Sequence, residues 1–496
     1  MNPPDYAGLA RALLPEAALV LGALLVLGLD LLFFRKHSRE SRLRSAVAIG
    51  ALAVVAAIGL NLRVGDAGSV FGGVLVLDPL AVAARVGVLL LTLLTFGVAT
   101  GTAPLRHPAE YIAIILFATV GFTLMAAAQQ LLLVFLALEL ASLSLYVLVG
   151  FDHARPESAE AALKYFLFGG MSAAFLLFGF SLLYGLTGSI DLPAIGAVLA
   201  KHDPQPLLLV ALTMVLVAFG FKAAAAPFHL WAPDAYQGAP TPSAALLASG
   251  SKLAGLTLFV RLLWPGLGSV AGHINPKYIS PGWLPVVVLL AVASLLVGNF
   301  AALAQTNIRR LLAYSAIAHA GVMLVGVMIA GSAGFAPLFY YAATYGISTV
   351  GAFGVIAVLE GRGGCQRITD LAGLHRRSPL LAGCLLVFVL SLAGIPPLAG
   401  FFGKFYIFAD ALSIGGATGE IGGATGPVGR VAVLAILLSA VAFYYYLAVL
   451  KQALVAPPAE GAAPVRVPLA AALTLVVAAV LLVLLGLFPT VLINGF

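Results

Sequence analysis

Charged side chains are scarce in this sequence. Asp, Glu, Lys and Arg make up 9% of its 496 residues, whereas hydrophobic residues make up 62%. Soluble globular domains contain about 25% charged residues. The shortage of charge therefore excludes an ordinary soluble domain, and the excess of apolar residues indicates a protein that lies mostly within a lipid bilayer.

Cysteine is almost absent too, and so are the usual signs of a metal or cofactor site. Cys365 and Cys384 lack the spacing of a disulfide framework or of a zinc site. His229, His273 and His319 lie on separate segments, without paired carboxylates or thiolates at ligand spacing. No segment has the pattern of a nucleotide-binding loop, a haem site or an iron–sulfur ligand set. We therefore expect no metal ion and no cofactor in this chain.

What the sequence holds instead is a series of long apolar runs. A helix needs about 20 apolar residues to cross the hydrocarbon core of a bilayer. Hydropathy predicts fourteen such spans, at residues 13–34, 46–62, 74–99, 111–128, 131–151, 161–187, 207–227, 242–264, 284–304, 310–330, 336–359, 380–411, 430–451 and 467–490. The first run leads into basic residues without a small-residue cleavage site, which indicates a retained helix rather than a signal peptide. The expected fold class is an all-α polytopic membrane protein with fourteen transmembrane helices.

The net charge of +7 comes mostly from loops, so it reflects topology and does not indicate binding to nucleic acid. Lys and Arg are concentrated in alternate loops, most densely in residues 35–44 and 361–377. The positive-inside rule places those loops in the cytoplasm. Because the number of predicted spans is even, both termini then lie on the opposite side of the membrane.

Five ionisable residues fall near the middle of predicted spans: Glu139, Lys222, Lys252, His319 and Lys404. A charge at the centre of the bilayer costs about 2.5–3.5 kcal/mol. Lys252 is about eleven residues, or roughly 17 Å, from either end of its span, which is too far for its ammonium group to reach the interface. Glu139 suits either a proton relay or a salt bridge that only holds helices together. His319 suits either the relay or a packing role.

Three other basic residues lie within spans but nearer to their ends. Lys164 and Arg261 are within a turn of a predicted end, so we expect their side chains to extend to the interface. Arg85 is deeper, and its neighbour Asp78 leaves its role open.

Proline interrupts two of the predicted spans. FGFK at 219–222 precedes Pro227 in span seven, and FGKF at 402–405 follows Pro396-Pro397 in span twelve. Interrupted helices at corresponding places indicate inverted repeats, as in secondary transporters; two unrelated kinks are the alternative. We expect two inverted five-helix repeats, spans 4–8 and 9–13, with broken helices 7 and 12 and with Lys222 and Lys404 at equivalent sites. The expected domains are an N-terminal three-helix segment at 1–110, the repeats at 111–265 and 284–451, and a C-terminal helix at 452–496.

Three stretches carry a resemblance to a known family. They read ELASLSLYVLVGF…ESAEAALKYFLFG, GFKAAAAPFHLWAPDAYQGAPTPSAALLASGSKLA and LAGIPPLAGFFGKFYIF. They closely resemble the antiporter-like membrane subunits of respiratory complex I, the NADH–quinone oxidoreductase, and the likeness covers nearly the whole chain. The resemblance implies that Glu139, Lys222, Lys252 and Lys404 carry protons, with His319 as a further member of the relay.

The resemblance also implies a function. It is that of a proton-translocating subunit of a redox-driven NADH:quinone oxidoreductase in the bacterial inner membrane, with periplasmic termini. Such a subunit belongs to an enzyme, a translocase, but performs no redox chemistry itself. FMN, iron–sulfur clusters and quinone are expected in partner subunits, and the direct partners are neighbouring antiporter-like and small membrane subunits. The alternatives are a multisubunit cation/proton antiporter, a related ferredoxin-, deazaflavin- or hydrogen-linked complex, and a purely structural scaffold.

Overall fold

The computed structural model of the chain describes residues 5–493, apart from residues 104, 202–204, 275–278, 363, 414–425 and 459–461. The two chain ends, which the sequence predicts to be periplasmic, lie outside the described residues. Within them, thirteen helices are long and apolar enough to cross a membrane. They are α2 with η1 (Leu14–Phe34), α3 (Arg39–Val64), α4 (Pro79–Ala99), α5 (Pro108–Ala127), α6 (Leu131–Val149), α7 (Pro156–Thr187), α9 (Pro206–Ala223), α11 with α12 and η2 (Thr241–Gly266), α13 (Trp283–Leu303), α14 (Ile308–Ala333), α15 (Ala336–Glu360), α19 (Pro427–Leu454) and α20 (Leu469–Leu487).

Each of these thirteen helices overlaps one predicted span. The remaining predicted span, 380–411, is divided into α17 (Pro379–Ala393) and α18 (Ala399–Ser413), each of 15 residues. Neither half is long enough to cross the bilayer alone, since about 20 residues are needed. The prediction of an all-α polytopic membrane protein is confirmed, whereas the count of fourteen spans stays a prediction.

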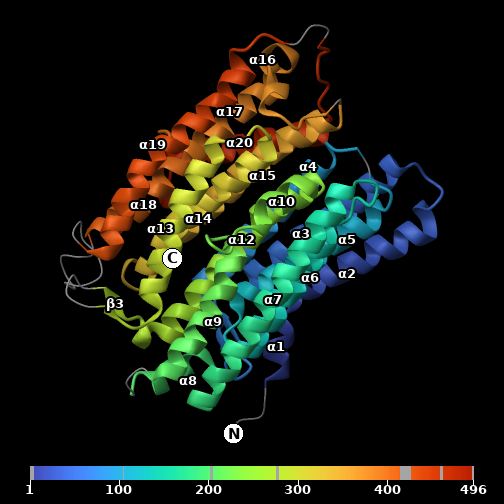
Figure 1. The fold of residues 1–496 in the computed structure, drawn as a ribbon. Coiled ribbons are helices and arrows are strands. Elements are labelled where there is room, and N and C mark those ends of the chain that lie inside the picture. The colour runs from blue at the N-terminus through green and yellow to red at the C-terminus, as the bar shows by residue number, and fades with distance from the viewer. Residues whose placement is uncertain are drawn as a thin grey trace.

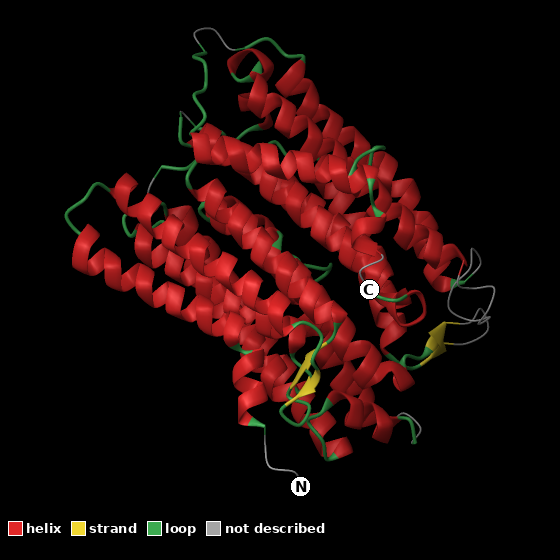
Figure 2. Ribbon diagram, turned by 180° about the vertical axis from the view of Figure 1, so that it is seen from behind, coloured by secondary structure: helices red, strands yellow, loops and turns green. Residues whose placement is uncertain are grey.

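The other elements are short. The helices are α1 (Tyr6–Ala12), α8 (Leu192–Leu199), α10 (Trp231–Gly238), η3 (Gly268–Val270), η4 (Ile368–Leu371), α16 (Leu374–Arg377) and α21 (Thr490–Ile493). The strands pair as two antiparallel ribbons: β1 (Gly68–Val70) with β2 (Leu75–Leu77), and β3 (His273–Ile274) with β4 (Ile279–Ser280). Figure 2 shows both ribbons at the same end of the helical bundle.

Both predicted helix breaks are present. In span seven, α9 ends at Ala223 and the chain resumes as α10 at Trp231. In span twelve, α17 and α18 are separated by the segment that contains Pro396 and Pro397. A third break was not predicted: span eight is divided at Ser249, where α11 (Thr241–Ala248) gives way to α12 (Gly250–Arg261).

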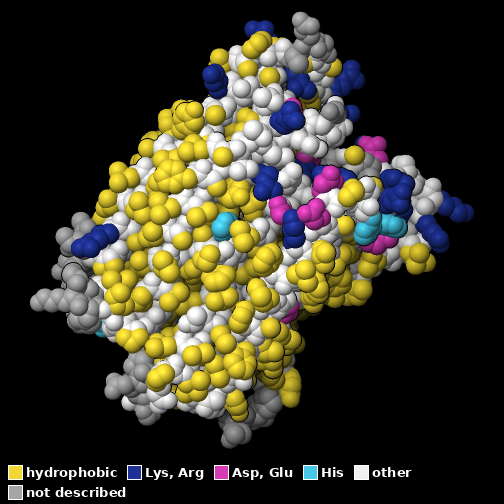
Figure 3. Space-filling model, viewed as in Figure 1, with side chains coloured by type: hydrophobic (Ala, Val, Ile, Leu, Met, Phe, Trp, Pro, Cys, Tyr) yellow, Lys and Arg dark blue, Asp and Glu magenta, His cyan; other side chains and the backbone are white. Residues whose placement is uncertain are grey.

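The most deeply buried helices form the middle of the molecule. In α11–α12, α14 and α15, 100%, 94% and 94% of the residues in the apolar stretch of each helix are buried, whereas only 28% are buried in α2, α3 and α20. Figure 1 shows this order, with α2 and α3 on one flank, α17 to α19 on the other and α10 to α15 between them. Figure 3 shows a broad hydrophobic surface with most of the visible charged side chains gathered at one end. The arrangement suits a bundle whose flanks meet lipid and whose centre shelters polar groups.

Candidate functional site

Lys222 lies at the end of α9 and is buried against α6. Its Nζ donates a hydrogen bond to Ser142 Oγ at 3.2 Å, and Ser142 follows Glu139 by almost one turn of α6. The charges of Glu139 and Lys222 are close enough to interact, but the two residues form no ion pair. The Glu139 Oε1 atom is buried without a hydrogen-bond partner. The salt bridge that would merely hold these helices together is therefore not formed.

The break after α9 exposes backbone carbonyls inside the bundle. Ala223 is the last helical residue, and Ala224 takes the left-handed conformation with φ 55°. The Trp231 indole donates a hydrogen bond to the Phe221 carbonyl at 3.2 Å. A helix C-terminus carries partial negative charge on its unpaired carbonyls, so this end of α9 can hold a cation.

Lys252 on α12 supplies such a cation. Its Nζ donates hydrogen bonds to the Ala223 carbonyl of α9 at 3.3 Å and to the Ala316 carbonyl of α14 at 2.6 Å. It also lies 5.8 Å from the centroid of the Tyr345 ring. Lys252 therefore faces the interior and contacts elements of both predicted repeats.

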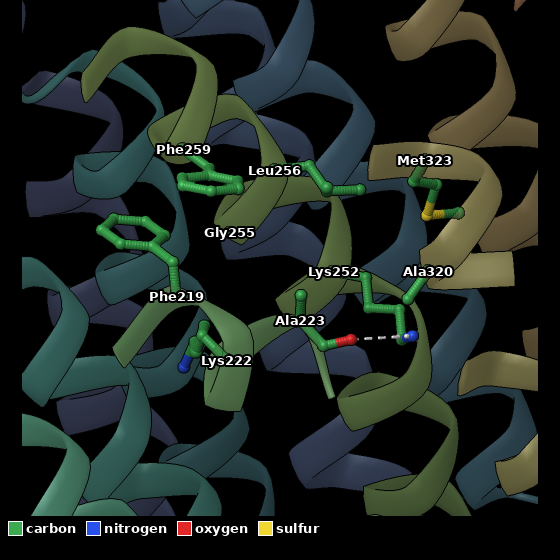
Figure 4. A pocket seen from close by; sticks show the side chains of 9 residues that line it. All are labelled: Phe219, Lys222, Ala223, Lys252, Gly255, Leu256, Phe259, Ala320 and Met323. Carbon is green, nitrogen blue, oxygen red and sulfur yellow. Dashed lines mark hydrogen bonds between the residues drawn. The ribbon is translucent and has the colours of Figure 1, made fainter. Parts of the chain in front are cut away.

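Figure 4 shows Lys222 and Lys252 on either side of Ala223. They line one cavity of about 10 Å³, whose other lining residues are Phe219, Ala223, Gly255, Leu256, Phe259, Ala320 and Met323. A cavity of that size is at the lower limit for a single water molecule. The space between the two lysines is thus small and bounded mostly by apolar side chains.

His319 on α14 is held at both ring nitrogens. Its Nδ1 shares a hydrogen bond with the Tyr341 hydroxyl at 2.6 Å, and its Nε2 shares one with the Tyr446 hydroxyl at 3.0 Å. The Tyr446 hydroxyl also bonds to Ser315 Oγ. The Tyr345 ring, whose other neighbour is Lys252, lies 4.9 Å from the imidazole centroid.

The imidazole lies within electrostatic range of two lysines. Its interactions with charged groups are with Lys404 and with Lys252. His319 thus lies near both lysines that flank it in the predicted relay.

Lys404 on α18 turns back to the end of α17. Its Nζ donates hydrogen bonds to the carbonyls of Leu392 and Ala393, both at 3.1 Å. The following residue, Gly394, has φ 85° and caps α17 in the left-handed conformation, as glycine commonly does. Here again a broken helix offers its last carbonyls to a buried ammonium group.

The two broken helices share a cap geometry but differ in where their lysine lies. Ala224 and Gly394 occupy the same left-handed position, and each precedes a proline with a cis peptide bond. Lys222, however, ends the helix before its break, whereas Lys404 lies in the helix after its break. The two lysines thus lie on opposite sides of their breaks along the chain, and their expected equivalence stays a prediction.

Two arginines correct the sequence interpretation. We expected Arg261 to extend to the interface, but it is only 6% exposed, pairs with Asp78 at 2.5 Å and donates to the Ala126 carbonyl at 2.7 Å. Arg85, whose role the sequence left undecided, is fully buried and pairs with Glu16 at 3.0 Å. Proximity to a span end indicated snorkelling for Arg261, but partners from distant segments hold the guanidinium groups of both Arg261 and Arg85 inside.

Lys164 does reach the end of its helix. Its side chain is 41% exposed and pairs with Glu160 at 2.6 Å and with Asp234 at 2.8 Å. Asp234 also accepts a hydrogen bond from Arg310. These ion pairs join α7, α10 and α14 at the end of the bundle, away from the relay.

The fold and the buried ionisable residues define a polytopic membrane subunit of the antiporter-like class. The family model described as "NADH:quinone oxidoreductase/Mrp antiporter, TM" matches residues 128–425, and the chain belongs to this family. NADH-quinone oxidoreductase subunit N 2 of Acidobacterium capsulatum is 48% identical, with 99% of each chain covered. Subunit N of Chloroflexus aggregans is 38% identical, with 97% of this chain and 94% of the relative covered. More particularly, then, the chain belongs to the subunit N family of NADH-quinone oxidoreductase.

Solved structures agree with this assignment. A chain of respiratory complex I from Thermus thermophilus with bound aureothin is 34% identical, has a TM-score of 0.76 and covers 97% of this chain and 99% of its own length. A chain of the Mrp complex from Dietzia sp. is 22% identical with a TM-score of 0.81, covers 99% of this chain and 96% of its own length, and shows the fold alone. In the sequence, the DLAGLHRRSPLLA loop predicts subunit N rather than its L and M relatives, and the comparisons confirm subunit N.

Proposed function

We propose that this chain translocates protons as a membrane subunit of an NADH:quinone oxidoreductase of the bacterial inner membrane. Glu139, Lys222, Lys252, His319 and Lys404 form the relay, and quinone reduction in other subunits drives it. FMN, iron–sulfur clusters and quinone belong to those partners, and the direct neighbours are other antiporter-like and small membrane subunits. The proposal rests on the hydrogen bonds of Lys252. Its ammonium group donates both to the broken end of α9 and to α14.

The buried lysines can exchange protons because each ammonium group donates its hydrogen bonds to uncharged acceptors. Burial disfavours the charged form of a lysine, and a nearby carboxylate opposes this effect. A small movement of Glu139 relative to Lys222 would therefore switch Lys222 between holding and releasing its proton. At about 6 Å and an effective dielectric constant of about 20, the attraction between the two charges is near 3 kcal/mol. That is enough to change proton occupancy by about a hundredfold.

A cation/proton antiporter is the second candidate, because the Mrp complex of Dietzia sp. has the same fold. The two functions differ in what drives the protons. Proton translocation in the first depends on electron transfer to quinone and proceeds without sodium, whereas antiport requires a cation gradient. Measuring quinone-driven acidification of inverted vesicles with and without sodium separates the two.

Replacement of Lys222 tests the proposal. We expect Lys222→Ala to lower proton translocation per quinone reduced by at least about tenfold, because a proton carrier in the relay is lost. Lys222→Arg should not restore it, since a guanidinium group does not release its proton. The matched control is Lys451→Ala, which removes an exposed lysine from the end of α19. Translocation at the level of the control by a fully assembled Lys222→Ala complex would refute the proposal.

A further inference from the structure

Two pairs of adjacent tyrosines lie around His319, and only one member of each pair contacts it. On α15, the Tyr341 hydroxyl bonds to His319, whereas the Tyr340 hydroxyl donates to the Leu485 carbonyl at 2.7 Å. On α19, the Tyr446 hydroxyl bonds to His319, whereas the Tyr445 hydroxyl donates to the Asn299 side chain at 3.3 Å. All four tyrosines are at most 2% exposed. The chain thus offers two relay-facing phenols and one matched control, Tyr340, because Tyr445 also interacts with Tyr446 and Ser315.

The bonds around the imidazole form a continuous series of hydroxyl groups. Ser315 Oγ bonds to the Tyr446 hydroxyl, which bonds to Nε2, and Nδ1 bonds to the Tyr341 hydroxyl. A neutral imidazole has one donor and one acceptor nitrogen, and a hydroxyl group can both donate and accept. Every bond in the series can therefore pass a proton on.

The two ends of this hydrogen-bonded series lie next to residues that adjoin or contact the two lysines. Ser315 immediately precedes Ala316, whose carbonyl accepts the hydrogen bond from Lys252. At the other end, Tyr341 packs against Gly403, where an added Cβ would lie 2.6 Å from Tyr341 Cδ2. Gly403 immediately precedes Lys404. One end of the series thus lies one residue from the carbonyl that accepts from Lys252, and the other end lies against the residue before Lys404.

We propose that Tyr446 and Tyr341 carry the proton into and out of the His319 ring, so that the relay between Lys252 and Lys404 runs Ser315, Tyr446, His319, Tyr341. The inference rests on the proposed function and names further residues of the same relay. Water completes the two outer steps, from Lys252 to Ser315 and from Tyr341 to Lys404.

The proton balance is simple when the ring starts as the Nδ1–H tautomer. A proton from Lys252 reaches Ser315, which passes its own hydroxyl proton to Tyr446, and Tyr446 passes its own to Nε2. Nδ1 gives its proton to the Tyr341 oxygen, and the former hydroxyl proton of Tyr341 leaves toward the neutral amine of Lys404. Only O–H and N–H bonds change, and one positive charge moves from lysine to lysine. The ring then carries its proton on Nε2, and exchange of that proton for one on Nδ1 through water restores the starting tautomer.

Removal of single hydroxyl groups tests the inference. Tyr341→Phe and Tyr446→Phe keep the buried ring and should each lower proton translocation by at least about tenfold, since a proton-transfer group contributes on the order of a hundredfold or more. Tyr340→Phe removes an equally buried phenol on the same helix as Tyr341 and should leave translocation within about twofold. Assembly is checked by native gel and by electron transfer from NADH to an artificial acceptor. Wild-type translocation by both assembled relay variants overturns the inference.

A second measurement distinguishes proton transfer from mere support of the histidine. Fluorotyrosine incorporated at position 341 or 446 keeps the hydroxyl and the packing but makes the phenol more acidic. We expect the pH profile of translocation to move to lower pH, while fluorotyrosine at 340 leaves the profile unchanged. An unchanged profile at positions 341 and 446 would refute proton transfer through the phenols, even if the phenylalanine variants fail to assemble.

Lys222→Ala, measured in parallel, separates the two hypotheses. If Lys222→Ala abolishes translocation and the tyrosine variants do not affect it, the tyrosine route is wrong and the proposed function stands. If Lys222→Ala has no effect, the proposed function itself fails.

Discussion

The acceptors of the buried lysines are neutral. Lys252 and Lys404 bond to backbone carbonyls, and Lys222 bonds to a serine hydroxyl. A contacting carboxylate would stabilise the ammonium group strongly and would itself be left as an uncompensated buried charge once the lysine lost its proton. Carbonyls stabilise the cation less and need no counter-charge when it becomes neutral. The chemistry around these lysines therefore favours proton exchange over a permanent ion pair.

The separation of Glu139 from Lys222 makes a prediction about coupling. Because their charges interact without contact, Glu139→Gln and Lys222→Ala should be non-additive in a double-mutant cycle of coupled activity. We expect an interaction energy of about 1 kcal/mol or more, as is usual for residues that share one network. Glu157→Gln, which neutralises an exposed carboxylate at the start of α7, should be additive with Lys222→Ala. Additivity of both pairs would mean that Glu139 and Lys222 do not act together.

Cys365 gives a pH prediction outside the membrane. It is buried in the loop after α15, and burial, with the nearby Glu360 and Asp370 carboxylates, raises the pKa of its thiol to about 12. A raised pKa keeps the unreactive protonated form up to high pH, since the thiolate is the nucleophile. Native Cys365 should therefore remain unlabelled by maleimide from neutral pH to about pH 9. A cysteine placed at the exposed neighbouring Gln366 should label readily, and more quickly as the pH rises.

At the scale of elements, the sequence predicted those breaks that proline marks. Pro227 and Pro397 cannot continue a helix, so spans seven and twelve were recognisable as interrupted. The break at Ser249 has no proline, and only the succession Ser249-Gly250-Ser251 signals it, since small Gly and Ser residues are frequent at kinks. This break precedes Lys252 by three residues, so the most central lysine of the relay also follows a helix interruption.

The sequence did not predict which side chains pair with each other inside the bundle. The ion pair of Arg261 with Asp78 and that of Arg85 with Glu16 join segments 183 and 69 residues apart in the chain. Whether an arginine near a span end reaches water or pairs inside depends on which helices pack beside it, and no local pattern records that. The tyrosines around His319 were missed for the same reason. Only one residue of each adjacent pair faces the histidine, and helix packing decides which.

At the scale of the whole molecule, the candidate relay crosses the bundle between its two halves. Glu139, Lys222 and Lys252 belong to the first expected repeat, and His319 and Lys404 to the second. The N-terminal helices pack alongside, with α4 against α12 and α15. Each half contains a helix break capped by a residue in the left-handed conformation, and this common feature supports the expected inverted repeats. The inverted orientation of one repeat relative to the other stays a prediction. A relay that runs between repeats would be sensitive to how the halves move against each other, as alternating-access transporters are.

The orientation of this bundle in the membrane is the last prediction. Residues 35–44 and 361–377 carry the densest basic clusters, so the positive-inside rule places both loops in the cytoplasm. Cysteines at the exposed positions Lys36 and Arg362 should react with an impermeant maleimide in inverted vesicles but not in intact cells. A cysteine at the exposed Ser69 of β1, in the loop beyond the next span, should show the reverse pattern. Labelling of Lys36→Cys or Arg362→Cys from the periplasm would invert the topology, and with it the side from which the relay takes up its protons.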